Sequence, residues 1–178
     1  DTCNANVIVE DHGTFAENCN RGANRAADDV LVFLNDDTIV QPGWAEAMLA
    51  CLETSHVVGA RLVYPDGRLQ HAGIYFDMPD GILTAHNRLE EIETAEVDAV
   101  TGACMMIRRA DFEALNGFDE TFRNGYEDVD FCLRARAAGA TIVYCADATI
   151  IHLESQSGSA RWTHVGENVR LLQERWMT

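Results

Sequence analysis

Two adjacent carboxylates follow directly after an apolar segment in the first quarter of the chain. Residues 30–34 read Val-Leu-Val-Phe-Leu, and Asn35, Asp36, Asp37 and Thr38 come next. Ligands of open α/β sheets lie beyond the carboxyl ends of strands, where neighbouring carboxylates repel each other unless a cation or a proton separates them. Mg²⁺ or Mn²⁺ would suit this pair together with substrate phosphates. A simple turn that caps the next element is the structural alternative.

A second acidic group stands at the start of a predicted helix. Glu127, Asp128 and Asp130 follow the pair Gly125-Tyr126. Acidic residues in a first turn complement the helix dipole, which is the structural interpretation. The functional interpretation is a general base at the mouth of a site.

His152 and the segment 101–103 are two further candidates. A lone histidine at the end of an apolar strand is most often a core residue, but beside two acidic groups it could complete a carboxylate metal site, with Mn²⁺ somewhat favoured over Mg²⁺. Thr101-Gly102-Ala103 interrupts an apolar stretch. Such a break indicates either a β-bulge or a close approach of the backbone to a ligand.

Hydrophobic periodicity predicts the elements that would position these groups. Strands are predicted over 6–10, 30–34, 57–63, 69–76, 141–145 and 148–152, and helices over 15–29, 42–53, 110–116 and 127–138. The continuous apolar run 30–34 predicts a strand covered on both faces, and Pro42 is expected in the first turn of its helix. Residues 77–96 are polar and are expected to form a surface excursion, whereas 97–107 are apolar. The alternation predicts an α/β fold with helices on both faces of a mixed sheet.

The last segment, 160–176, is predicted as a helix with one apolar stripe. The stripe consists of Trp162, Val165, Val169, Leu172 and Trp176, which recur at helical spacing. We expect this stripe to dock on the domain or on a neighbouring domain.

Composition restricts the function further. The 178 residues carry a formal net charge of −16, so the surface repels nucleic acid, and no nucleic-acid partner is expected. All 13 basic residues are arginine, which excludes Walker-type phosphate loops and Schiff-base chemistry. No apolar run approaches the ~20 residues of a transmembrane segment. The six scattered cysteines favour reduced thiols in the cytosol over a disulfide framework.

Taken in order along the chain, these motifs resemble the inverting family 2 glycosyltransferases. The matching segments are 33–38, Pro42-Gly43-Trp44, 59–62 with 64–67, 100–104, 117–120, 127–131 and His152. Each is weak alone, but the ordered series is specific and covers nearly the whole chain. The segment Leu69-Gln70-His71-Ala72-Gly73 is similar to bacterial enzymes that build cell-surface polysaccharides, including rhamnosyltransferases.

The resemblance implies a GT-A fold, a three-layer α/β/α arrangement with a mixed central sheet. It also implies metal-dependent, inverting transfer of a sugar from a nucleotide-diphosphate donor to a hydroxyl of a glycan or lipid-linked acceptor. Asp37 and His152 would bind the divalent cation, Mg²⁺ or Mn²⁺. Asp128 would be the catalytic base, and Glu127 would help to position it.

The resemblance also assigns contacts to the two substrates. The donor-binding residues would be Asn20, Arg21, Asn35, Asp36, Gly102 and Ala103. Trp44 and Tyr126 would lie on the acceptor side. Residues 1–178 would form a single catalytic domain, in which 1–60 are the remaining donor-binding half and 61–178 are the acceptor-side half.

The chain departs from the family pattern at its start. Family members begin with strand–helix units that hold the nucleotide base. By this resemblance the chain starts at the third strand, which predicts an N-terminally truncated domain with an exposed sheet edge. A missing N-terminal part or another copy of the chain would then contact that edge, and the 178 residues alone could be inactive. The expected location is the cytoplasm, with peripheral association at the inner face of the membrane left open.

Two other function classes fit less well. A phosphotransferase of the haloacid dehalogenase type needs an aspartate nucleophile where this chain has Asn35, and it commonly uses a lysine. A non-catalytic module that recognises a sugar or a protein remains the alternative to an enzyme, although Asp37, Asp128 and His152 occurring together argue against a degenerate site.

Overall fold

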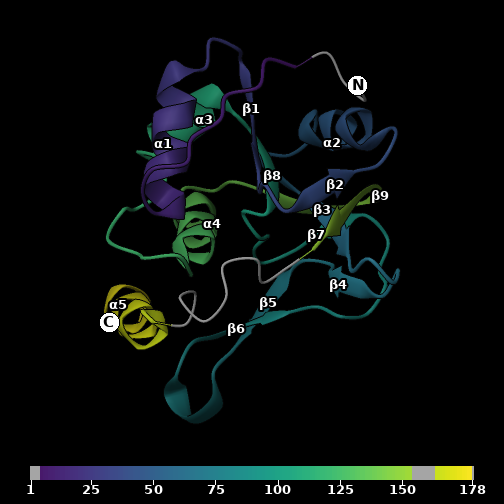
Figure 1. Ribbon diagram of the computed structural model, residues 1–178. Coiled ribbons are helices and arrows are strands. Elements are labelled where there is room, and N and C mark those ends of the chain that lie inside the picture. Colours follow the sequence, from purple (N-terminus) through teal and green to yellow (C-terminus); the bar gives the residue numbers. More distant parts are fainter. Residues whose placement is uncertain (1–4, 154–162, 178) are drawn as a thin grey trace.

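The chain folds into three layers, with a mixed sheet between two sets of helices. The computed structural model describes residues 5–153 and 163–177. Helices α1 (Phe15–Arg25), α3 (Arg109–Ala114) and α4 (Glu127–Ala137) cover one face of the sheet, and α2 (Trp44–Leu52) covers the other (Figure 1). This arrangement confirms the predicted α/β class with helices on both faces.

The central sheet combines parallel and antiparallel pairs. Its order is β1 (Val30–Leu34), β8 (Cys104–Arg108), β3 (Val57–Val63), β9 (Ile142–His152) and β2 (Thr38–Val40), with β4 (Leu69–His71) on β3 and β7 (Ala95–Glu96) on β9. Strands β3 and β9 run parallel, and the other pairs run antiparallel. A separate hairpin consists of β5 (Ile74–Asp77) and β6 (Thr84–Asn87), with a 3₁₀ turn, η1 (Pro79–Gly81), between them.

Side-chain alternation along the strands divides the interior into two cores. In β3, Val57 faces the core under α1, α3 and α4, and its neighbour Val58 faces the core under α2. Met105 and Met106 of β8 divide in the same way. This is the period of two that a strand imposes on its side chains, and it fixes which face each strand-end residue can reach.

Strand β1 corrects one prediction, because it is covered on one face only. Leu31 and Phe33 are buried, whereas Val32 and Leu34 are 37% and 42% exposed. The cause is position: β1 lies at the edge of the sheet, and α2 packs against β3, β8 and β9 instead.

The segment 6–10 is irregular rather than the predicted strand. Val7 and Val9 are largely exposed. Glu10 attaches the segment to α1, since its carboxylate accepts hydrogen bonds from Arg21, 3.1 Å away, and from Arg25.

Other predicted boundaries shift for local reasons. The strand 69–76 divides into β4 and β5 at Gly73, whose φ of +90° favours glycine. The excursion 77–96 contains β6 and β7, and 97–107 becomes a strand only from Cys104. The strands predicted at 141–145 and 148–152 form one strand, β9, with a register shift between Cys145 and Thr149. Helix α1 ends at Arg25, and Pro42 precedes the Gly43 cap of α2.

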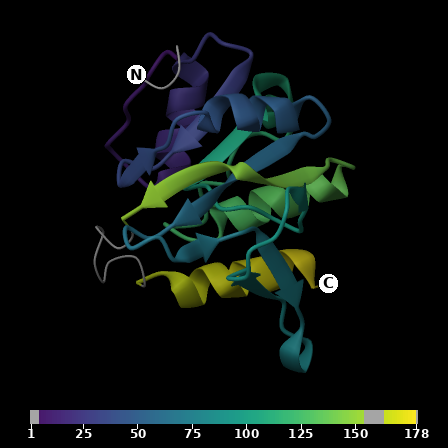
Figure 2. The same cartoon turned by 90° about the vertical axis from the view of Figure 1, so that its right-hand side faces the viewer.

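The C-terminal helix α5 (Val165–Trp176) packs beside α4 and the β5–β6 hairpin (Figure 2). Leu172 is fully buried and Trp176 packs against the core, as the stripe predicted. Asn168 is also buried, so the docked face is partly polar. Trp162 and the predicted start at 160–162 lie outside the described residues. Within the described part, none of the helices has the length and apolar character of a membrane span.

Candidate functional site

Asp37 and His152 meet where β2 pairs with β9. Thr38 lies opposite His152 in the antiparallel register, and the Leu153 amide donates to the Asp37 carbonyl at 2.9 Å. This pairing brings Asp37 Oδ1 within 3.1 Å of His152 Nε2, and both side chains are less than 15% exposed. The structure therefore brings together two residues that are 115 positions apart in the sequence.

Gln70 determines which nitrogen of His152 faces Asp37. The Gln70 amide nitrogen donates to the His152 carbonyl at 3.4 Å, which turns its oxygen toward His152 Nδ1 at 2.6 Å. Because that oxygen accepts a hydrogen bond, Nδ1 carries the proton, and Nε2 of the neutral ring presents a lone pair to Asp37. Asp37 Oδ1 is buried and has no hydrogen-bond partner among the described residues.

The lone pair of His152 Nε2 and the carboxylate oxygen Asp37 Oδ1 repel each other at 3.1 Å unless a positive charge lies between them. Either a second proton on the imidazole or a bound cation would supply it. The oxygen and nitrogen donors, together with an orienting amide behind the histidine, fit a divalent metal site. No cluster of three His, Cys, Asp or Glu side chains with metal-binding geometry occurs in residues 5–153 and 163–177.

The other two members of the acidic turn have different surroundings. Asp36 is exposed. Asn35 is held through its backbone, since its amide donates to the Ala103 carbonyl at 3.0 Å and its carbonyl accepts from Thr38 Oγ1 at 2.6 Å. The turn after β1 is therefore fastened to the segment that contains Gly102 and Ala103.

Asp128 stands at the first turn of α4 with both carboxylate oxygens oriented. Its Oδ2 accepts from the Gly102 amide at 2.9 Å, and its Oδ1 accepts from the Val129 amide at 2.8 Å. Each oxygen keeps a second lone pair for a proton. Glu127 is buried, and its carboxylate accepts from the Gly125 amide at 2.5 Å. Tyr126, half-buried, begins the helix at a positive φ of 70°, and burial raises the pKa of its phenol.

Gly102 is needed for a close approach, although the group it approaches belongs to the protein. A Cβ at this position would lie 2.6 Å from Phe15 Cζ and 3.5 Å from Asp128 Cβ. Packing against α1 therefore requires a glycine here and at the same time places the Gly102 amide against Asp128, whereas the contact of Gly102 with the sugar donor stays a prediction.

Three residues that were predicted to contact the substrates make contacts within the protein. Asn20 donates to the Phe118 carbonyl and to Glu120, and its oxygen accepts from the Phe118 amide, all at 2.9 Å, so both polar atoms of its side chain bind the protein. Arg21 binds Glu10, the His12 carbonyl and Asn18. Trp44 is 5% exposed in the core under α2, which removes it from the acceptor side.

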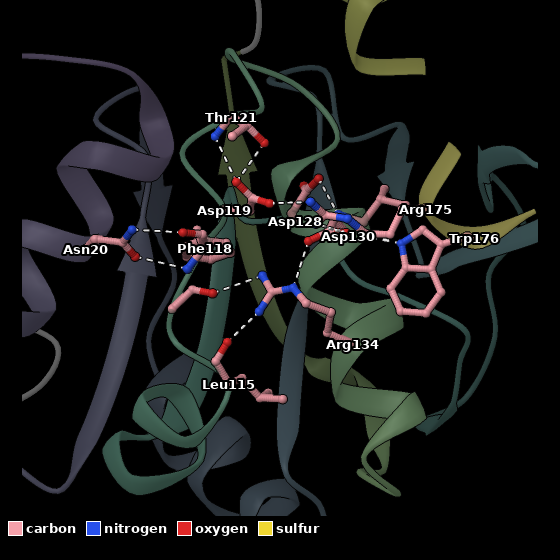
Figure 3. Close-up of polar contacts among 12 residues, drawn as sticks. Asn20, Leu115, Phe118, Asp119, Thr121, Asp128, Asp130, Arg134, Arg175 and Trp176 are labelled. Atoms are coloured by element: carbon pink, nitrogen blue, oxygen red, sulfur yellow. Dashed lines mark hydrogen bonds and ion pairs between the residues drawn. The ribbon is translucent and has the colours of Figure 1, made fainter. Parts of the chain in front are cut away.

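Asp130, the third carboxylate of the acidic group, anchors α5. It is fully buried and accepts from Arg134 at 2.7 Å, from Arg175 at 2.8 Å and from the Trp176 indole at 3.1 Å. Figure 3 shows Arg175 reaching both Asp130 and Asp119, the latter at 2.6 Å. Helix-dipole complementation alone does not explain this carboxylate, since it is the centre of a polar network.

Gln70 and His71 are the site residues that sequence patterns did not single out for a role. His71 is 1% exposed and follows Gln70, the residue that binds His152, in β4. The signal available in the sequence was two adjacent polar side chains in an otherwise apolar strand. Their partners are distant in the chain and could not be read from spacing.

Comparison with known proteins identifies the family of the chain. A sequence profile described as glycosyltransferase-like family 2 matches residues 3–177. The O-antigen biosynthesis protein RfbC of Myxococcus xanthus is 35% identical over 156 residues, which are 79% of this chain and 12% of that protein. An N-acetylglucosaminyl-diphospho-decaprenol L-rhamnosyltransferase of Mycobacterium tuberculosis is 30% identical over 149 residues, 73% of this chain and 48% of that protein. The chain thus spans half or less of the length of these relatives.

Solved structures identify the fold. A crystal structure of GalNAc-T7 with UDP, GalNAc and Mn²⁺ superimposes with a TM-score of 0.67 at 17% identity, covering 92% of this chain and 35% of that one. A structure of Drosophila β1,4-galactosyltransferase 7 with manganese, UDP-Gal and xylobiose gives 0.53 at 17% identity, covering 88% and 60%. The three-layer architecture is that of GT-A glycosyltransferases, as the motif series predicted.

Proposed function

The chain belongs to glycosyltransferase-like family 2, and on this premise we propose that it transfers a sugar from a nucleoside-diphosphate donor to a hydroxyl of a glycan or lipid-linked acceptor. The observation that carries the proposal is the Asp37–His152 pair, whose buried Asp37 Oδ1 accepts no hydrogen bond within the described residues, together with an Asp128 that a backbone amide orients. The relatives named for O-antigen biosynthesis and rhamnose transfer support an acceptor in surface polysaccharide synthesis.

Asp37 and His152 would hold a divalent cation, Mg²⁺ or Mn²⁺. The fit rests on Asp37 Oδ1, on the lone pair that Gln70 directs toward it, and on the preference of these cations for oxygen and imidazole donors. The structural neighbours contain Mn²⁺ or manganese beside UDP or UDP-Gal, which supports the same choice. When bound, such a cation offsets the charge that develops on a departing diphosphate.

Asp128 would act as the base. Its two hydrogen bonds to backbone amides fix the carboxylate, so a free lone pair can accept the proton of the acceptor hydroxyl as that oxygen attacks the sugar. A single displacement of this kind needs no protein nucleophile and inverts the configuration at the anomeric carbon. Glu127 would maintain the Gly125–Tyr126 turn that precedes the base.

The substrates would lie on either side of these groups. We propose Asp36, Asn35 and the Gly102–Ala103 backbone for the donor side and Tyr126 for the acceptor side. In the proposed single domain, 1–60 would contribute to the donor half and 61–178 to the acceptor half.

A transfer assay tests the proposal. The purified protein would be incubated with UDP-galactose, UDP-GalNAc or a nucleoside-diphosphate L-rhamnose and with N-acetylglucosaminyl-diphospho-polyprenol, in Mn²⁺, in Mg²⁺ or in EDTA. We expect transfer with one donor, loss in EDTA and recovery with excess Mn²⁺. NMR of the product would show the inverted anomer.

Carboxylate variants assign the roles. Asp128→Asn should lower kcat by about 10²- to 10⁴-fold, the usual contribution of a positioned base, and Asp37→Asn should abolish activation by the cation. Glu46→Gln, an exposed carboxylate on α2, is the matched control and should retain activity. Full activity of Asp128→Asn, or activity that EDTA leaves unchanged, would contradict the base or the metal assignment respectively.

A further inference from the structure

His71 contains a buried nitrogen that lacks a partner. The residue ends β4 and is 1% exposed. Its Nδ1 lies 3.0 Å from Asn87 Oδ1 across to the β5–β6 hairpin. Its Nε2 is enclosed by protein and makes no hydrogen bond within the described residues. A buried polar atom of this kind is rare in native structures, and it is destabilising unless something satisfies it.

The chemical form of the ring follows from its surroundings. The Asn87 oxygen can only accept, so Nδ1 is the protonated nitrogen and Nε2 presents a lone pair. Burial lowers the pKa of His71 to about 4, which keeps the ring neutral at physiological pH. Nε2 is therefore a hydrogen-bond acceptor, and its natural partner is a hydroxyl or another neutral donor.

The position of the ring joins it to the proposed site. The preceding residue of β4, Gln70, binds His152, and side chains alternate along a strand, so His71 faces the opposite side of β4. Leu69 lies two residues before His71 and therefore on the same side of β4, and it packs against the core that α4 covers. Asp128 lies in the first turn of α4. The charges on Asp128 and His152 both act on the ring, the first raising and the second lowering its pKa.

We propose that His71 is a substrate-binding residue, whose Nε2 accepts a hydrogen bond from a sugar hydroxyl held between Asp128 and the Asp37–His152 pair. The inference rests on the proposed transfer reaction and adds a specificity contact to it. Because the nitrogen is enclosed, a hydroxyl that reaches it loses its hydrating water, and an analogue without that hydroxyl leaves Nε2 without a hydrogen-bond donor. Sites built in this way discriminate strongly against the deoxy analogue.

Kinetics of three variants test the contact. His71→Phe removes the acceptor and should raise KM for one substrate by about fivefold or more, the effect of one neutral hydrogen bond. His71→Gln retains an acceptor oxygen and should recover part of the loss. His56→Phe, an exposed histidine near the other end of β3, is the matched control and should leave both KM values unchanged. Thermal unfolding of each variant identifies any loss of folded protein.

Deoxy sugars identify the source of the hydroxyl. The KM of each variant would be measured with the donor and the acceptor in turn, each against analogues that lack one hydroxyl. For one analogue we expect the KM of the wild type and that of His71→Phe to be equal. Whether this analogue is a donor or an acceptor identifies the substrate that supplies the hydroxyl. A folded His71→Phe variant with unchanged KM values for both substrates would overturn the inference.

A binding readout separates this inference from the proposed reaction. Histidine ¹⁵N NMR reports the protonation of each ring nitrogen and the hydrogen bond that Nε2 accepts. The expected result is an unprotonated Nε2 whose resonance shifts with UDP-galactose plus Mn²⁺ or with methyl N-acetylglucosaminide. If transfer fails with every donor but this shift occurs, the proposed reaction is wrong and the binding role stands. If neither probe moves the resonance, His71 is a core residue.

Discussion

Gln70 controls the Asp37–His152 pair from outside it. Its amide accepts the Nδ1 proton of His152 while it donates to the backbone of the same residue, so the imidazole is fixed in one tautomer. In metal sites such an outer partner keeps the ligating nitrogen free of a proton. The two residues predicted from the sequence therefore depend on a third that the sequence did not indicate.

Replacing Gln70 by leucine tests this dependence. The variant removes the acceptor for Nδ1, so His152 can move its proton to the nitrogen that faces Asp37. We expect Mn²⁺ affinity to fall by about 10- to 100-fold, the usual effect of losing an outer-shell partner, and calorimetric titration with Mn²⁺ measures it. Gln41→Leu on the exposed turn before α2 is the control. Unchanged Mn²⁺ affinity in Gln70→Leu would count against a metal at this pair.

His71 makes folding stability depend on pH in a definite direction. Its pKa is about 4 in the folded chain, below the ordinary value of 6.5, chiefly because of burial. Below pH 6.5 the unfolded chain binds a proton that the folded chain does not, so the free energy of unfolding decreases as the pH falls toward 4; above 6.5 the residue contributes no pH dependence. Between pH 7 and 5 the loss should be about 2 kcal/mol.

Urea unfolding at both pH values measures this loss. His71→Gln should be less sensitive to pH by that amount, because it has no group that titrates there. Equal pH dependence in His71→Gln and the wild type would show that the buried ring does not cause it.

At the scale of elements, side-chain amides fasten loops and helices that lie far apart in the sequence. Asn20 of α1 exchanges two hydrogen bonds with the backbone of Phe118, and Asn168 of α5 does the same with Arg123. Gln173 of α5 pairs with both backbone groups of Leu83 between β5 and β6. Each side-chain amide makes both a donor and an acceptor hydrogen bond with one backbone residue, as a neighbouring strand would. Together these contacts fix the loop before α4 and the position of α5.

Asp130 should be the strongest of the contacts that hold α5. Asp130→Ala leaves Arg134, Arg175 and the Trp176 indole without their shared acceptor. Removing one member of a buried charged network typically costs about 3–5 kcal/mol, and we expect the lower end because both arginines are partly exposed. Hydrogen exchange should be accelerated in α5 before the rest of the chain.

Asp119→Ala is the matched control for this change. It removes the more exposed carboxylate that Arg175 binds, so it should cost about 1 kcal/mol or less and leave exchange in α5 nearly unaltered. If the two variants lost equal stability, α5 would not depend on the buried carboxylate.

Local patterns predicted these elements well and their partners poorly. The helix at 127–138 and the strand at 57–63 were predicted within a residue, because capping glycines and apolar periodicity are local signals. Residues 30–34 were expected to be covered on both faces, but an apolar run does not reveal that β1 is an edge strand. The role of Asp130 was hidden for the same reason, since its partners lie 45 and 46 residues away.

For the molecule as a whole, the order of motifs carried more information than any single one. The sequence indicated the GT-A layers, the Asp37–His152 meeting and the oriented Asp128. Trp44 was assigned to the acceptor side although it is a core residue, and Asn20 and Arg21, which were assigned to the donor, bind other parts of the chain. Residue type alone does not reveal such contacts within the protein.

The net charge of −16 predicts a salt-dependent stability. At about 0.01 M salt the screening length is ~30 Å, so nearly all the acidic side chains repel one another, whereas at 0.1 M it is ~10 Å. The folded chain holds these charges closer together than the unfolded chain does, so added NaCl should stabilise it. We expect the free energy of unfolding to increase by about 1 kcal/mol, which corresponds to a rise in Tm of about 3 °C, measured by calorimetry between these two salt concentrations.

Glu90→Gln/Glu93→Gln removes two exposed charges and should reduce the rise in Tm, whereas Arg68→Gln should increase it. A Tm that fell or stayed constant would show that local ion pairs such as Arg61–Glu91 dominate over the net repulsion.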